Sequence, residues 1–236
     1  MKVEIWSDVA CPWCHVGKRR FEAAMAEFPH REQVDVEWRS FELDPSAVST
    51  TDGDQSDYAD RLASKYGTTR EGAQQMLDTM TAAAAAEGLD FRFDRAVKAN
   101  TFDAHQVIHL AGERGVQDAV KERLLRAYFA EGAAVGDQAV LARLAGEAGL
   151  DTDEVRDALA EQRYAAAVRA DEAEASALGI TGVPFFVIDR IYAVSGAQPP
   201  EQILAALQQA WNESHPFTLV GADNEAPVCG PDGCQV

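Results

Sequence analysis

The stretch Val3-Glu4-Ile5-Trp6-Ser7-Asp8-Val9-Ala10-Cys11-Pro12-Trp13-Cys14 decides how the rest of this sequence is interpreted. Residues 3–7 have the character of a short strand, and a brief loop separates them from Cys11. Pro12 suits the first position of a helix, because the N–H that proline lacks has no intrahelical partner there. The stretch therefore predicts a strand, a loop and a helix that begins at a pair of cysteines.

The segment that follows completes a β-α-β unit. Phe21, Met25 and Phe28 recur at the helical period, so the helix should run to about residue 28. Apolar and charged residues then alternate over residues 34–39, which predicts a second strand. Because a helix connects them, the two strands should lie parallel.

From about residue 56 to residue 178 the sequence is rich in Ala, Glu, Arg and Leu and has helical periodicity. Glycines stand where these helices are expected to end. The expected helices cover residues 58–66, 70–87, 101–114, 116–130, 138–148, 153–162 and 165–178.

Strand character returns near the end of the chain. Residues 184–188 and 191–195 should pair as an antiparallel hairpin around a turn at Asp189-Arg190, and a helix should follow at 200–211. We expect an α/β protein in which both ends contribute to one sheet. Its parts are one domain from residues 1–55 and 179–212, an inserted all-helical domain at 56–178, and an irregular tail at 213–236.

The chemistry centres on Cys11 and Cys14. Two thiols separated by two residues at a helix start can close a disulfide with little backbone movement, and the helix N-terminus favours a thiolate. We therefore expect the pKa of Cys11 to fall from about 8.5 into the range of roughly 3.5–7.5. Cys11 is predicted to be the nucleophile, and Cys14 is predicted to resolve the mixed disulfide.

A second pair, Cys229 and Cys234, lies near the C-terminus. Gly230-Pro231-Asp232-Gly233 between them is a strong turn signal, so the two sulfurs can approach each other. We interpret them as an accessory redox pair; an inert local disulfide or two idle thiols are the alternatives. All four cysteines could instead bind zinc, but a helix-start pair is built to form a disulfide, and we expect no metal.

Composition limits the partners. The chain has 39 acidic and 21 basic residues and a net charge of −18, which disfavours binding to a phosphate backbone. Its one basic triplet, Lys18-Arg19-Arg20, is expected to be a solvated helix face. No apolar run approaches the roughly 18–20 residues that a membrane helix needs, and the start lacks an apolar signal core. We expect a cytoplasmic protein with no nucleic-acid or membrane partner.

The sequence Thr181-Gly182-Val183-Pro184 leads directly into the third strand, and with the cysteine motif it resembles the DsbA-like thioredoxin superfamily. Members have a thioredoxin fold with an inserted helical domain. More narrowly, the chain resembles the FrnE group of cytosolic members over about residues 1–212. Further motifs that carry the resemblance are Trp6-Ser7-Asp8, Phe41-Glu42-Leu43-Asp44-Pro45 and Asn100-Thr101-x-Asp103-Ala104-His105.

The resemblance implies a cis peptide bond before Pro184, which would face the cysteines, although a trans proline is commoner on base rates. It implies that the backbone of Val183 pairs with a bound polypeptide. It also implies a C-terminal pair such as Cys229 and Cys234. The implied activity is disulfide exchange on proteins, with oxidoreductase and isomerase character. Implied partners are protein thiols and disulfides, unfolded polypeptides and a thioredoxin- or glutathione-type electron donor, without a bound cofactor.

Other residues near the motif have two interpretations each. A protonated His15 turned toward Cys11 would stabilise the thiolate, or the ring points to solvent. Asp8 could act on thiol protonation, or backbone donors could satisfy it.

Residues farther from the motif complete the expected site. By resemblance, Asn100 and His105 face the active-site cleft; His105 either moves protons or is simply packed. Trp13 and Phe185 are expected to supply apolar surface for unfolded substrates.

A glutathione-dependent enzyme for small molecules is the alternative function. The 2-hydroxychromene-2-carboxylate isomerases and kappa-class glutathione transferases share the inserted fold. They use the glutathione thiol and typically carry serine where Cys11 stands. Because this chain retains both Cys11 and Cys14, the sequence favours dithiol chemistry.

Overall fold

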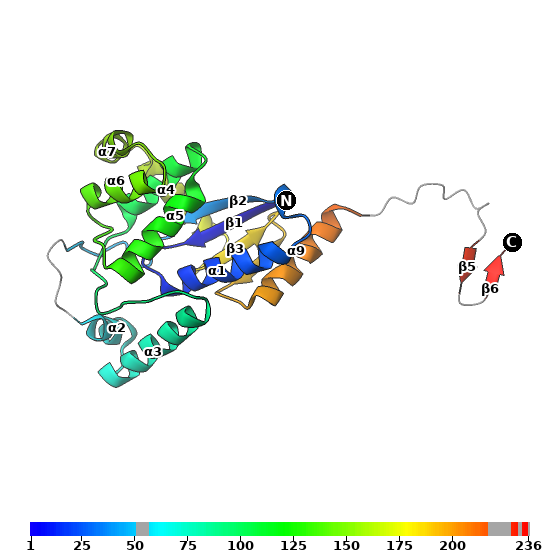
Figure 1. Ribbon diagram of the computed structural model, residues 1–236, viewed down its shortest axis with the longest axis horizontal. Coiled ribbons are helices and arrows are strands. Elements are labelled where there is room, and N and C mark those ends of the chain that lie inside the picture. Colours follow the sequence, from blue (N-terminus) through cyan, green and yellow to red (C-terminus); the bar gives the residue numbers. More distant parts are fainter. Residues whose placement is uncertain (51–56, 217–227, 231–232, 236) are drawn as a thin grey trace.

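A four-stranded sheet organises the computed structural model, which describes residues 1–50, 57–216, 228–230 and 233–235 (Figure 1). The strand order is β2-β1-β3-β4. β1 and β2 are parallel, whereas β3 is antiparallel to both β1 and β4, so both ends of the chain share one sheet as expected. The strands are β1 (Lys2–Ser7), β2 (Asp35–Ser40), β3 (Phe185–Ile188) and β4 (Tyr192–Ser195).

Helices α1 (Pro12–Glu27) and α9 (Pro200–Ser214) lie side by side on one face of the sheet (Figure 1). Because side chains alternate along a strand, Val3 and Ile5 of β1 and Phe186 of β3 all point into the core beneath these helices. Phe21 of α1 stacks on Phe186 with ring centroids 5.6 Å apart. This packing fixes the start of α1 relative to the end of β1.

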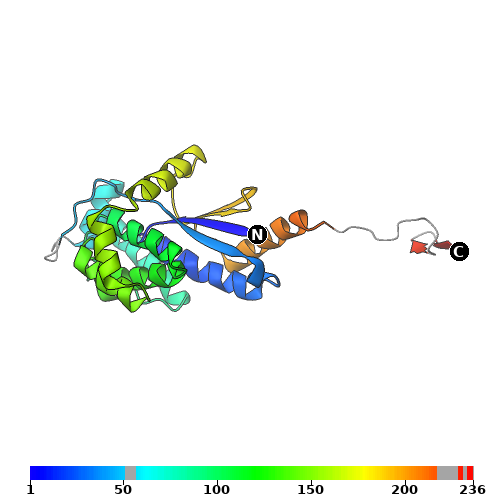
Figure 2. The same ribbon diagram turned by 90° about the horizontal axis from the view of Figure 1, so that it is seen from above.

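The opposite face is covered by α8 (Ala165–Ala177), which Figure 2 shows across the sheet from α1 and α9. Trp6 and Val187 point to this side and pack with Ala175 and Ile180. The Trp6 indole N–H donates to the carbonyl of Asp171 at 3.0 Å. Both faces of the central strands are therefore buried.

Each expected helix between β2 and β3 is present, with small shifts at the ends. The expected helix at 116–130 ends as an α-helix at Arg126 and continues as a π-helical turn to Glu131. A short 3-10 turn, η1 (Arg31–Gln33), precedes β2. The helices are α2 (Tyr58–Tyr66), α3 (Arg70–Ala86), α4 (Phe102–Glu113), α5 (Gln117–Arg126), η2 (Ala127–Glu131), α6 (Gln138–Glu147), α7 (Thr152–Ala160) and α8.

The expected domain boundary at residues 55–56 lies outside the described residues. The tail, expected to be irregular, contains the short antiparallel strands β5 (Val228–Gly230) and β6 (Gly233–Gln235). Their backbone register places Cys229 opposite Cys234.

The basic triplet of α1 is not the solvated face that we expected. Lys18 is 1% exposed and its ammonium lies 3.1 Å from Asp118 Oδ2 and 3.2 Å from Glu122 Oε2, both on α5. It also pairs with Glu22 on its own helix. Because buried charges must be paired, these contacts require α5 to lie directly against α1.

Within the described part of the chain, no helix combines the length and the apolar character needed to span a bilayer. The helices instead bury their apolar faces against the sheet or against each other.

Replacing Gly17 with alanine should destabilise the protein. An added Cβ would lie 2.7 Å from Pro184 Cγ, and the proline ring has little freedom to move away. Although alanine favours a helix, we expect a net loss of about 1–3 kcal/mol from overpacking. Urea unfolding of Gly17→Ala, compared with Gly182→Ala, whose added Cβ would meet no atom, measures this loss. An unchanged midpoint for Gly17→Ala would contradict the close packing.

Candidate active site

The two cysteines lie where β1 ends and α1 begins. Cys11 is the residue that caps α1, and the Cys14 N–H donates to the Cys11 carbonyl at 3.1 Å. Both are free thiols; Cys11 is 4% exposed and Cys14 is completely buried. The loop before them is held by a bond from the Cys11 N–H to the Asp8 carbonyl at 3.3 Å. Only one sulfur of the pair is therefore within reach of solvent.

A proline loop closes over the pair. The Val183–Pro184 peptide bond is cis, as the resemblance implied. The Cys11 Sγ donates to the Val183 carbonyl oxygen at 3.5 Å, and the Pro184 carbonyl accepts from the Gly196 N–H at 2.9 Å. The loop before β3 thus contacts the Cys11 sulfur directly.

A cleft of about 1040 Å³ opens beside Cys11. Its walls come from the loop before α1, from α2 and α3, from the segment before α4 and from the proline loop. Trp13, Tyr66 and Met76 present exposed apolar surface there, with 36%, 59% and 37% of each residue accessible. The cationic side chains that line the cleft are Arg61, Lys65 and Lys98.

The two thiols titrate as a pair because each lies against the other. Burial opposes ionisation of Cys14, but the Cys11 thiol and the charge of Lys121 outweigh it and lower the pKa of Cys14. The Ser7 hydroxyl adds to this effect. The contact with Cys14, together with burial, raises the pKa of Cys11 well above its usual value. Of the two thiols, Cys14 is therefore the one that ionises more readily.

The lowered pKa that we expected for Cys11 is wrong for this resting pair. Cys11 Sγ faces a carbonyl oxygen and the Cys14 sulfur, both of which favour its protonated form. The helix N-terminus acts on the pair as a whole, whereas the Cys11 thiol and, after it, the charge of Lys121 lower the pKa of Cys14 in particular.

The sequence matches the model of the DSBA-like thioredoxin domain family over residues 2–208. This protein belongs to the DsbA-like thioredoxin family. The uncharacterized protein YwbO of Bacillus subtilis is 30% identical to it over 188 residues, which are 79% of this chain and 86% of YwbO. The narrower resemblance to the FrnE group stays a prediction.

Solved structures of similar fold include a "probable DsbA oxidoreductase" from Streptomyces coelicolor. It is 52% identical, has a TM-score of 0.84, and the match covers 100% of this chain and 99% of that one. The cytosolic disulfide reductase DsbM from Pseudomonas aeruginosa, solved with GSH, is 19% identical with a TM-score of 0.62 over 90% and 100%. A 2-hydroxychromene-2-carboxylate isomerase is 12% identical with a TM-score of 0.65 over 91% and 98%. At these identities the last two show the fold alone.

In this DsbA-like protein, Asp8 and His105 form a buried pair. His105 Nε2 lies 3.6 Å from Asp8 Oδ1, and both residues are 1% exposed. The carboxylate also accepts from the backbone N–H groups of Ala10 at 3.2 Å and Leu43 at 2.8 Å. Burial opposes ionisation, yet His105 and these donors lower the pKa of Asp8. Asp8 is thus a carboxylate satisfied largely by backbone donors, and His105 lies behind it, away from the cleft wall.

His15 neither points to solvent nor acts as a cation beside Cys11. Its ring is 3% exposed, lies near Phe91 and Phe129, and its Nε2 is 3.6 Å from Glu122 Oε1. Burial lowers the pKa of His15 despite the opposing effect of Glu122, so the ring is mainly neutral at neutral pH. A neutral ring does not provide the charge that thiolate stabilisation would need.

Two further residues expected at the cleft lie elsewhere. The Phe185 side chain points to the α8 face of the sheet, where it packs against the cluster that contains Trp6 and Val187. Asn100 holds loops together: its side-chain amide donates to the Pro45 carbonyl at 3.2 Å, and its Oδ1 accepts from the Phe102 N–H at 3.0 Å. Of the residues expected to contact substrate, the structure brings Trp13 and Val183 to the cleft.

Sequence reasoning missed Lys121. This lysine of α5 is 1% exposed, and its ammonium donates to the Ser7 carbonyl at 3.4 Å. A signal was present, because Lys121 lies among Val120, Leu124 and Leu125, in the buried phase of an amphipathic helix. What the sequence did not show is which element that phase faces.

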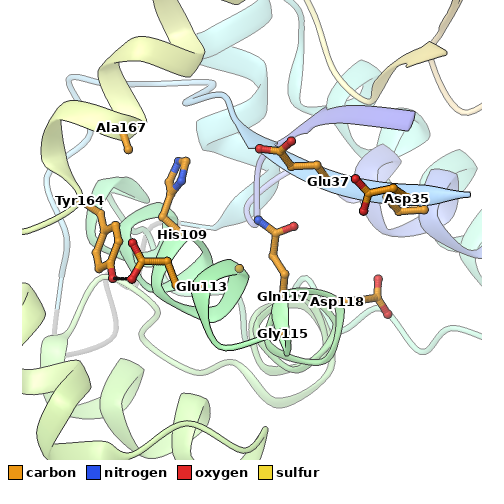
Figure 3. A pocket seen from close by; sticks show the side chains of 11 residues that line it. Asp35, Glu37, His109, Glu113, Gly115, Gln117, Asp118, Tyr164 and Ala167 are labelled. Carbon is orange, nitrogen blue, oxygen red and sulfur yellow. Dashed lines mark hydrogen bonds between the residues drawn. The ribbon is translucent and has the colours of Figure 1, made fainter. Parts of the chain in front are cut away.

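A second hollow, of about 600 Å³, lies between β2, α4, α5 and α8 (Figure 3). No cysteine, lysine or arginine is among the described residues that line it, and carboxylates dominate. Figure 3 shows the Tyr164 hydroxyl bonded to Glu113, a contact of 2.7 Å. This hollow is separate from the dithiol site. The zinc alternative for the cysteines needs the side chains of Cys229 and Cys234, which lie outside the described part.

The reduced active-site pair should ionise in two well-separated steps. In protein carrying Cys229→Ser and Cys234→Ser, we expect one thiolate at a pH below the usual cysteine pKa and the second well above it, because the sulfurs share one charge. The ultraviolet absorbance of thiolate against pH measures both steps. Adding Cys14→Ser should lower the pKa of Cys11, since the competing charge is gone. Coincident ionisation at an ordinary cysteine pKa would contradict the shared charge.

Proposed function

We propose that this protein is a thiol–disulfide oxidoreductase that acts on protein substrates through Cys11 and Cys14. The observation that carries the proposal is two free thiols at the start of α1, one buried and one at a large cleft, in contact with a cis-proline loop. Membership of the DsbA-like family supports it.

The first step is attack by Cys11. A proton passes from the Cys11 thiol to the Cys14 thiolate, which moves the negative charge to the accessible sulfur. The Cys11 thiolate then attacks a substrate disulfide; an S–S bond to Cys11 forms, and the substrate S–S bond breaks. The leaving substrate thiolate takes a proton from water in the cleft.

The second step is resolution by Cys14. Cys14 first gives up the proton that it received in the first step, and this proton passes out to solvent. Its thiolate then attacks Cys11 Sγ, forms the intramolecular disulfide and releases the second substrate sulfur as a thiolate. The substrate gains two electrons and the enzyme pair loses two. The reverse sequence oxidises a substrate dithiol, and the pair's potential, expected within roughly −270 to −120 mV, sets the direction.

Recognition of protein substrates fits the surfaces around Cys11. Trp13, Tyr66 and Met76 offer exposed apolar side chains that suit unfolded segments. The backbone of Val183 lies at the nucleophilic sulfur, where an extended polypeptide would pair with it. A cytoplasmic location, as expected from the sequence, would make a thioredoxin- or glutathione-type donor the source of electrons.

A redox titration in glutathione buffers tests this function. We expect Cys11 and Cys14 to form one reversible disulfide within the window given above, identified by thiol trapping and mass mapping, and Cys14→Ser to accumulate a mixed disulfide at Cys11. Reduction of a scrambled protein disulfide should be lost in Cys11→Ser. If the pair never closes, the proposal fails; glutathione-dependent aromatic isomerase activity that survives Cys11→Ser would favour the alternative enzyme.

We also propose that Cys229 and Cys234 pass electrons between an external donor and the active-site pair. Their opposed backbone positions in β5 and β6 suit a reversible local disulfide. The double variant Cys229→Ser/Cys234→Ser should lose several-fold in multiple-turnover rate with a thioredoxin-type donor. Its single-turnover reaction with substrate disulfide should match wild type. Equal multiple-turnover rates would show that the second pair is idle.

A further inference from the structure

Two lysines are buried at the contact between α1 and α5, and their surroundings differ. Lys18 and Lys121 are each 1% exposed, and both ammonium groups lie near the Trp38 ring, at 6.0 and 5.6 Å from its centroid. Lys18 pairs with carboxylates on both helices. Its charge is therefore compensated by carboxylates, and its role is to hold α1 against α5.

Lys121 has no such partner. Within the described residues no carboxylate lies within ion-pairing distance of its ammonium, whose one hydrogen bond is the 3.4 Å contact with the Ser7 carbonyl. An unpaired ammonium in a protein interior is strongly unfavourable, so such a lysine either releases its proton or faces another anion. Burial lowers the pKa of Lys121 to about 8, which brings it near neutrality.

Cys14 is the group whose charge acts most strongly to hold a proton on Lys121. The charges of Asp8 and Cys11 follow, while Lys18 acts in the opposite sense. Asp8 is already satisfied by two backbone N–H groups and His105. Besides Lys121, the Cys11 thiol, the Ser7 side chain and a backbone group of Asp8 lower the pKa of Cys14.

The end of β1 brings the amine and the sulfur together. The Ser7 carbonyl accepts from Lys121, and the side chain of the same residue is among the groups that lower the pKa of Cys14. Cys14 and Lys18 are one helical turn apart on α1, and Lys121 lies one turn from Asp118 on α5. The ion pairs of Lys18 therefore fix the position along α1 at which the Lys121 side chain lies.

We propose that Lys121 is the proton-exchange partner of the resolving thiol, Cys14. The proposal rests on the function proposed above and assigns a residue of the inserted helices to it. Lys121 acts on Cys14 from within the protein, so it does not contact the substrate.

In the mixed disulfide Cys14 is a neutral thiol, so Lys121 lacks its counter-charge and releases its proton to solvent. The Cys14 thiol then gives its own proton to the neutral Lys121 amine, which leaves a thiolate beside an ammonium. The thiolate attacks Cys11 Sγ; the Cys14–Cys11 bond forms, the Cys11–substrate bond breaks, and the substrate sulfur leaves with the electron pair. Once Cys14 is in a disulfide, Lys121 has lost its counter-charge and releases the proton. Reduction of the disulfide returns the proton to Lys121.

Replacing Lys121 with methionine tests the proposal. Methionine fills a similar volume without charge, and such replacements of buried charges are often tolerated. In reduced protein with serine at positions 229 and 234, we expect the first thiol ionisation of Lys121→Met to move up by about one pH unit or more, which is about tenfold less thiolate at neutral pH. Release of glutathione from its mixed disulfide with Cys11 should slow by a similar factor at neutral pH and recover at higher pH.

Lys2→Met is the control. It makes the same change of net charge at the start of β1, where the Lys2 ammonium pairs with Glu37, far along the strand from the cysteines. It should leave the thiol titration and the pH profile of glutathione release unchanged. The proposal is overturned if folded Lys121→Met titrates and resolves like wild type, or if Lys2→Met changes the thiol titration as much.

A measurement on wild-type protein covers the case in which Lys121→Met does not fold. The chain has five lysines, so the Lys121 signal can be assigned in NMR spectra of lysine labelled at Cε. Its pKa should be lower in the oxidised than in the reduced protein, and equal values in the two states would refute the proposal. Failure of wild-type Cys11 and Cys14 to close a disulfide would instead refute the proposed function itself.

Discussion

The ion pairs between Lys18 on α1 and two carboxylates on α5 are the contact on which the active site depends. A fully buried ammonium is tolerated only with close anionic partners, so Asp118 and Glu122 fix the position and rotation of α5. That arrangement directs Lys121 toward the start of α1. The inserted helices therefore do more than cover the thioredoxin-like sheet, because one of them supplies a charge beside Cys14.

The site as a whole keeps several charges out of water and gives each a different form of compensation. Asp8 uses backbone donors and His105, as a loop carboxylate commonly does. Lys121 instead faces a sulfur whose charge appears and disappears during disulfide exchange. A static ion pair stabilises one state, whereas a partner that changes charge with redox state links protonation to the reaction. Lys18, whose carboxylate partners keep their charge, therefore has a structural role, whereas Lys121, whose partner changes charge, has a functional one.

The local patterns of the sequence predicted much of the fold and the centre of the site. Strand alternation, helical periodicity and the turn at Asp189-Arg190 each depend on neighbours in the chain, and the sheet and helices formed where they indicated. The spacing of Cys11 and Cys14 behind a strand indicated dithiol chemistry in the same way. The cis bond before Pro184 came from the family resemblance, and the structure has it. The wrong placements, at His15, Asn100, His105 and Phe185, concerned where a side chain points once segments pack together.

By itself, then, the sequence determined the β-α-β and β-β-α units, the helical segments between them and the position of two thiols at a helix start. Only the tertiary structure decided that the pKa of Cys14 is lowered while that of Cys11 is raised, and that Lys121, bonded to the Ser7 carbonyl, is a cation that acts on Cys14. The physical reason is the separation in sequence over which each kind of interaction acts. Helix and strand preferences act between residues a few positions apart, whereas the electrostatic environment of a buried sulfur is set by whichever distant segment packs against it.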